Sequence, residues 1–155
     1  MTKEFEKSLA PWLGKTMKCV ENKIEERLEE NGLDISKMQF LLLRSVYQKE
    51  GICQNELAFF SNRNKSSLTR AINTLEKKNY IARMASKEDR RINQLFITKQ
   101  GLQMLEKAKP LFLDMAALIE SGLSKEEIEA TINTLKKIQK NVAGKEIGYL
   151  LNNEL

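Results

Sequence analysis

Hydroxyl, amide and basic side chains gather on one face of the segment from Lys65 to Lys78. The apolar residues of this segment recur at helical spacing, at Leu68, Ala71, Ile72 and Leu75. Such spacing predicts a helix with one buried face. The opposite face carries Lys65, Ser66, Ser67, Thr69, Arg70 and Asn73. Groups of these types hydrogen-bond base edges and phosphate oxygens, so the predicted chemistry is non-covalent recognition of DNA.

Two short runs of β-branched or bulky apolar residues follow, at 80–85 and 93–97. The charged connection between them predicts a β-hairpin. Its tip holds Lys87, Glu88, Asp89, Arg90 and Arg91. Adjacent arginines at an exposed tip suit phosphates or a narrow minor groove, where the negative potential is enhanced. Thr98, just after the second run, is placed to cap a new helix.

The net charge of +5 is concentrated on this part of the chain. From Arg63 to Arg91 there are nine Lys and Arg residues against three Asp and Glu residues. An isolated basic helix is often only a solvated face. Here the hairpin with its arginines follows directly, and the combination favours an electrostatic contact with an acidic polymer.

Three motifs follow one another between Ser67 and Gly101. They are Ser67-Leu68-Thr69-Arg70-x-Ile72-x-x-Leu75-Glu76-Lys77-Lys78-x-x-Ile81-x-Arg83, Asp89-Arg90-Arg91, and Leu95-x-Ile97-Thr98-x-x-Gly101. The combined string resembles the multiple-antibiotic-resistance regulator (MarR) family, whose members are winged helix-turn-helix repressors and activators. One departure is Asn79, where the family usually has glycine. Asparagine can supply the same left-handed backbone conformation.

The resemblance implies a mainly α fold with a small β-hairpin wing, in a single domain over residues 1–155. A winged helix-turn-helix DNA-binding region is expected over 32–101. A helical dimerisation layer, built from the N- and C-terminal helices, is expected over 1–31 and 102–155. A homodimer with two-fold symmetry should bind a pseudo-palindromic operator in double-stranded DNA.

The residue patterns outside the motifs fit this order of helices. One long helical pattern covers about 3–31, and its apolar stripe is long enough to need a partner subunit as cover. The range 54–61 is predicted to be the first helix of the helix-turn-helix. A helix is predicted from 98 to about 120, and Ser124 with Glu127 forms a capping box at the start of the last one.

By the resemblance, the predicted helix reads DNA and the hairpin is the wing. Residues expected near bases are Ser66, Ser67, Thr69 and Arg70, and those expected on phosphates are Lys65, Asn73 and Lys77. Arg90 and Arg91 should contact DNA from the wing tip, with Arg91 in the minor groove. Asp89 should orient a neighbouring arginine through an ion pair.

Family members often release DNA when a small, commonly aromatic, ligand enters a crevice between the dimer layer and the reading domain. Residues that could line this crevice are Trp12, Thr16, Met38 and Leu42. Plain core or dimer packing explains the same residues and is the favoured interpretation. Cys19 invites comparison with the peroxide-sensing branch of the family, but a buried, inert thiol is the favoured alternative.

Other function classes have little support in the sequence. The chain has two cysteines and no histidine, and it shows no metal-ligand spacing, glycine-rich phosphate loop or paired catalytic motif. We therefore expect neither enzyme activity, a cofactor nor a metal site. No signal peptide or long apolar run is present, which predicts a cytoplasmic protein without a membrane partner.

A winged-helix protein-interaction module without specific DNA binding is the alternative function, because the fold alone does not decide. Such a module has no need of Arg70, Arg90 and Arg91 together on one exposed surface. These three arginines therefore favour the DNA-binding regulator, which we expect to act as a repressor.

Overall fold

The computed structural model describes residues 6–61 and 65–144, and the side chains of residues 58–61 and 65 lie outside that description. The elements are α2 (Leu9–Glu30), α3 (Lys37–Gln48), β1 (Ile52–Cys53), α4 (Gln54–Ser61), α5 (Lys65–Lys77), β2 (Ile81–Ala85), β3 (Asn93–Ile97), α6 (Lys99–Glu120) and α7 (Lys125–Ala143). The predicted class, mainly α with a small hairpin wing, is confirmed.

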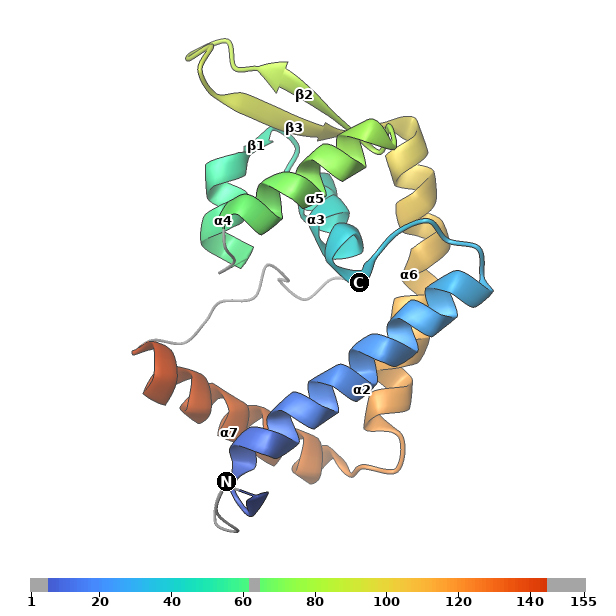
Figure 1. The fold of residues 1–155 in the computed structure, drawn as a ribbon, viewed down its shortest axis with the longest axis vertical. Helices are drawn as coiled ribbons and strands as arrows, with labels where there is room; N and C mark the ends of the chain where they lie inside the picture. Colours follow the sequence, from blue (N-terminus) through green and yellow to red (C-terminus); the bar gives the residue numbers. More distant parts are fainter. Residues whose placement is uncertain (1–5, 62–64, 145–155) are drawn as a thin grey trace.

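Figure 1 shows two groups of elements, joined by the long helix α6 and by the segment between α2 and α3. Helices α3, α4 and α5 gather beside the sheet, and the β2–β3 hairpin projects from them as a wing. Helices α2 and α7 lie at the other end of the molecule with the second half of α6. Because α6 starts beside the base of the wing, it connects the two groups directly.

The predicted apolar stripe of α5 is buried. Leu68, Ile72 and Leu75 are at most 1% exposed. They share one cluster with Phe40, Leu43, Val46, Ile52, Leu57, Ile81 and Leu95. Each fully buried side chain of this size contributes about 1.5–3 kcal/mol. This burial fixes which face of α5 is turned outward.

The sheet contains one strand that the sequence did not indicate. β2 and β3 pair antiparallel, with Ile81 opposite Ile97 and Ala85 opposite Asn93. β1 adds to the other edge of β3, so the order is β1-β3-β2. A strand of two residues is too short to show an alternating pattern, which is why only the hairpin was predicted.

The ends of α5 and α6 are joined by hydrogen bonds. Asn79 has φ of 57°, the left-handed conformation that was expected there. The Thr98 Oγ1 hydroxyl donates to the Asn79 carbonyl at 2.6 Å and accepts from the Gly101 amide at 3.0 Å. The predicted cap is therefore confirmed, and it ties the start of α6 to the exit of α5.

The first described long helix begins later than predicted. α2 starts at Leu9 with Ser8 in the N-cap position, whereas the sequence indicated a start near residue 3; residues 1–5 lie outside the description. Pro11 lies in the first turn of α2. Amide groups of a first turn have no partner within the helix, so proline removes no hydrogen bond there.

The capping box predicted at Ser124 and Glu127 is present at the start of α7. Among the described residues, none of the helices combines the length and apolar character needed to cross a membrane.

Candidate nucleic-acid interface

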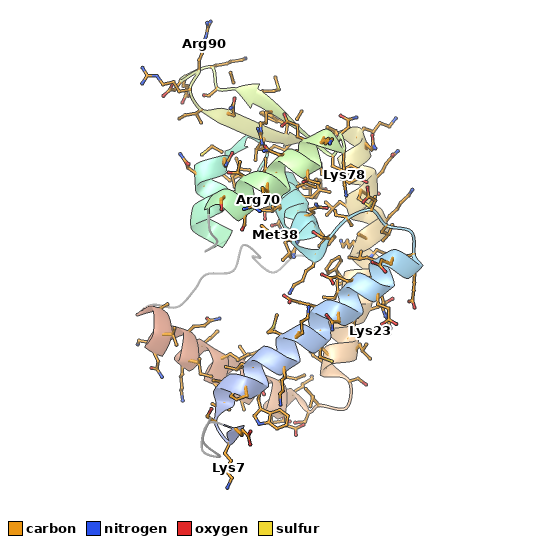
Figure 2. The ribbon with its side chains drawn as sticks, in the orientation of Figure 1. Lys7, Lys23, Met38, Arg70, Lys78 and Arg90 are labelled. Carbon is orange, nitrogen blue, oxygen red and sulfur yellow. The ribbon has the colours of Figure 1, made fainter. Side chains whose placement is uncertain are left out.

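The outward face of α5 presents a row of polar and basic side chains. Its exposed members are Ser66, Ser67, Arg70, Asn73 and Lys77. Steps of three and four residues place Ser66, Arg70, Asn73 and Lys77 one helical turn apart on the same face. Figure 2 labels Arg70 on this helix. The side chain of Lys65 lies outside the described residues.

Thr69 differs from these neighbours because its side chain is half-buried and accepts a hydrogen bond within the protein. Its Oγ1 accepts a hydrogen bond from Nε2 of Gln54 at 2.6 Å. Gln54 is the first residue of α4, so this bond joins the two helices of the helix-turn-helix. Gln54 was not predicted as a site residue, although a polar side chain in the first turn of α4 was a signal that could have identified it.

Arg83 reaches from the wing strand β2 to the exposed face of α5. Its Nη2 donates to Oδ1 of Asn73. Its Nε lies 3.4 Å from Oε2 of Glu76. The Nε of Arg83 is buried and has no hydrogen-bond partner among the described residues. Arg83 belongs to the motif recognised in the sequence but received no role there. Asn73 was predicted to contact a phosphate, and the oxygen of its side-chain amide already accepts a hydrogen bond from Arg83.

The wing tip carries Arg90 and Arg91, and both are exposed. Figure 2 shows the Arg90 side chain extending from the end of the wing, away from the protein. Two arginines at a projecting tip can reach a groove that the helices do not enter.

Asp89 shapes this tip through the main chain. Its Oδ1 accepts from the Arg91 backbone amide at 2.9 Å. The predicted ion pair between Asp89 and a neighbouring arginine is absent from the salt bridges of the described residues. The physical reason is local: an aspartate side chain readily accepts from the amide two residues ahead and so closes a turn.

Glu56 fixes the start of α4. Its carboxylate accepts from Lys49 Nζ at 2.6 Å and from the Cys53 backbone amide at 2.9 Å. The Lys49 hydrogen bond first, and then the Cys53 amide, lower the pKa of Glu56 to about 2. The carboxylate also satisfies an amide that the helix start leaves without an intrahelical partner.

A Glu56→Gln variant should change how stability depends on pH. Because folding lowers the pKa of Glu56, its stabilisation is complete above the unfolded value and is lost as pH falls through about 2. The side chain is 41% exposed, so solvent screening limits the effect to about 1 kcal/mol. Urea titrations should show a wild-type advantage at pH 7 that disappears near pH 2. Glu50→Gln, in the turn that precedes β1, controls for loss of one charge, and an advantage independent of pH would contradict the assignment.

The four residues predicted around an effector crevice are not brought together around a described cavity. Trp12 is 63% exposed and Leu42 only 2% exposed. Thr16 is exposed and Met38 half-buried. Two shallow cavities, of 660 and 520 Å³, lie along α6 and are lined by other residues. The effector site therefore stays a prediction.

Many large apolar side chains are exposed on the elements at the end of the molecule away from the wing, and together they are called the exposed apolar surface. It comprises Leu9, Trp12, Met17, Leu113, Leu118, Ile119, Leu123, Ile132, Leu135 and Val142. α7 has no buried residue among those described, although its apolar residues form a stripe. An amphipathic helix is normally stabilised by packing of its apolar face, and none of the residues that the structure describes supplies that packing for α7.

Two further predictions concern reactive side chains. Cys19 is exposed in this protomer, so the favoured interpretation of a buried thiol is wrong for the single chain. Within residues 6–61 and 65–144, no three His, Cys, Asp or Glu side chains are grouped so as to hold a metal ion.

Comparison with known proteins finds similar sequences among transcriptional regulators. Residues 35–92 match the model of the MarR family. The HTH-type transcriptional regulator YybA of Bacillus subtilis (strain 168) is 27% identical over 115 residues, which cover 74% of this chain and 77% of that protein.

Solved structures share the arrangement beyond the matched segment. A MarR-family transcriptional regulator from Listeria monocytogenes, complexed with a 26mer DNA, is 25% identical with a TM-score of 0.76, covering 89% of this chain and 91% of that one. A mutant MarR from E. coli, complexed with operator DNA, is 26% identical with a TM-score of 0.70, covering 81% and 92% respectively. Residues 35–92 of this chain therefore carry a MarR-family domain, and its fold is that of solved MarR-family regulators.

Proposed function

We propose that the chain is a sequence-specific DNA-binding transcriptional regulator. The observation that carries the proposal is the exposed row on α5 beside a projecting wing tipped by Arg90 and Arg91. An α-helix fits the major groove, and arginines suit a narrow minor groove. The relatives from Listeria monocytogenes and E. coli, both solved with DNA, support the same assignment.

The contacts divide by chemistry. Ser66, Ser67 and Arg70 reach base edges from the first half of α5, and Arg70 can place two donors on O6 and N7 of a guanine. Lys65 and Lys77 contact phosphates, which adds affinity without base preference. Thr69 lies near the bases with its hydroxyl oxygen held by Gln54. Arg91 enters the minor groove with Arg90 beside it.

The regulator acts as a homodimer on a pseudo-palindromic operator. Residues 1–31 and 102–155 form the dimerisation region, and 32–101 form the DNA-binding region. The exposed apolar side chains on α2, α7 and the second half of α6 support this division, because these parts lie away from the reading helix and the wing in Figure 1. Two-fold symmetry then presents two reading helices to half-sites about one DNA turn, roughly 10 bp, apart.

We further infer that the protein is a cytoplasmic repressor. A small aromatic ligand releases it from DNA. The ligand would enter between the two regions, where Trp12, Thr16, Met38 and Leu42 are the candidate lining residues. Occupancy of DNA by a regulator is itself a steric block to transcription. Release requires only that the ligand bind better to the conformation that does not fit the operator.

The test is fluorescence-anisotropy binding to DNA fragments from around the chain's own gene, at 50 to 200 mM salt. We expect site-selective binding that weakens steeply with salt. Arg70→Ala with Arg91→Ala should reduce affinity for the selected site by about 1–3 kcal/mol for the base contact alone.

Lys109→Ala with Lys125→Ala is the matched control, because it removes two exposed cations from α6 and α7 outside the proposed interface. This control should bind nearly as the wild type does. Weak binding that is equal on all fragments, and equal in both double variants, would favour the protein-interaction module instead.

A further inference from the structure

The hydrogen bond between Arg83 and Asn73 fixes which end of the Asn73 amide is turned outward. Arg83 Nη2 donates to the Asn73 side chain. A guanidinium has donors and no acceptor, so the Asn73 atom facing it must be the oxygen. The opposite end of the amide is Nδ2, which carries two N–H donors. Asn73 therefore presents donors to any further partner.

The position of Asn73 on α5 indicates what that partner is. Asn73 is exposed, and it lies between Arg70 and Lys77 in the polar row. It belongs to the second half of α5, whereas base edges are read mainly by the first residues of a recognition helix. A pair of N–H donors flanked by two cations is complementary to a phosphate, whose oxygens only accept hydrogen bonds.

We propose that Arg83 is a positioning residue that turns the Asn73 amide so that its N–H groups donate to a phosphate of the bound DNA. This inference rests on the proposed function. Arg83 acts through Asn73 because its own side chain is only 25% exposed and its Nε is buried 3.4 Å from the Glu76 carboxylate. The wing strand thus orients a contact made by the reading helix.

Asn73→Asp separates this role from a merely structural link between α5 and β2. An aspartate accepts from Arg83 as a charged pair, so stability toward urea should be equal to or greater than that of the wild type. Its second oxygen, however, faces the phosphate and repels it. We expect affinity for operator and for unrelated DNA to fall by about tenfold or more. If residue 73 only links α5 to β2 and does not face DNA, binding should be unchanged.

Asn73→Ala and Arg83→Met test whether the two residues act together. Asn73→Ala should weaken binding about threefold to tenfold on every DNA sequence. It should leave the salt slope unchanged, because the amide that it removes is uncharged, whereas Lys77→Ala should lower the slope by about one. The double variant Asn73→Ala/Arg83→Met should bind no more weakly than Asn73→Ala. Thermal unfolding of Arg83→Met checks that it is folded.

Each remaining outcome has a defined meaning. Wild-type affinity in Asn73→Asp, or losses that add in the double variant, would overturn the role of Arg83 while leaving the proposed function intact. If Asn73→Ala weakened binding only to DNA that carries one particular base pair of the operator, Asn73 would contact a base edge rather than a phosphate. That result would overturn the inference. If the wild type itself shows no site-selective binding, the proposed function fails and the inference fails with it.

Discussion

Gly101→Ala is expected to lower the free energy of unfolding by about 3 kcal/mol or more. A Cβ on residue 101 would lie 1.9 Å from the Tyr80 carbonyl oxygen and 2.8 Å from the Tyr80 carbonyl carbon. That oxygen is held in place because it accepts from the Thr98 backbone amide at 3.1 Å. The added methyl group must push α6 away from the base of the wing. Alanine's helix preference over glycine, about 1 kcal/mol, is too small to offset this.

Gly14→Ala is the matched control, because Gly14 also lies within a helix but a Cβ there meets no atom within 4 Å. It should raise the free energy of unfolding by about 0.5–1 kcal/mol. Urea titrations of both variants, compared at equal m-value, measure the two effects. A loss smaller than about 1 kcal/mol in Gly101→Ala would contradict the close approach of α6 to Tyr80.

Ile132→Glu combined with Leu135→Glu should convert the proposed dimer to monomer and weaken operator binding by about 10²- to 10⁴-fold. These side chains are 46% and 36% exposed in the single chain, so the substitutions remove little packing within a protomer. In a dimer they would place two charges per subunit in an apolar contact, which is costly without partners. The affinity loss follows because a monomer binds one half-site and gains nothing from the second.

Size-exclusion chromatography with light scattering gives the mass, and anisotropy gives the operator affinity. Asn133→Glu is the control, since helical spacing puts residue 133 away from the apolar stripe of α7 and it is exposed. It should remain a dimer and bind as the wild type does. A double variant that stays dimeric would exclude this face of α7 from the interface.

The parts of the fold that were predictable are those with a strong local pattern. The stripe through Leu68, Ile72 and Leu75 has helical period and is buried as expected. The two hairpin strands are apolar runs around a charged turn, and their boundaries differ from the prediction by no more than one residue. Asn79 and Thr98 were recognisable because the backbone conformation and the cap at these positions each favour few residue types.

The parts that were not predictable depend on contacts between elements. β1 is stabilised by β3, more than 40 residues away, and has no pattern of its own. Nothing in the spacing of Gln54 and Thr69, or of Arg83 and Asn73, shows that these side chains meet. Asp89 was expected to pair with a neighbouring charge, whereas its carboxylate accepts from a backbone amide. The DNA contacts themselves stay predictions.

The single helix α6 makes the position of the wing sensitive to small angles at the other end of the molecule. Its 22 residues span about 33 Å at 1.5 Å per residue. A rotation of about 5° at its far end would therefore displace the wing base by about 3 Å, close to the 3.4 Å rise of one base pair. Two subunits rotating in opposite senses would change the distance between their reading helices by about two base pairs. Operator fit can thus be lost through a change of angle alone, with every hydrogen bond inside the reading region unchanged.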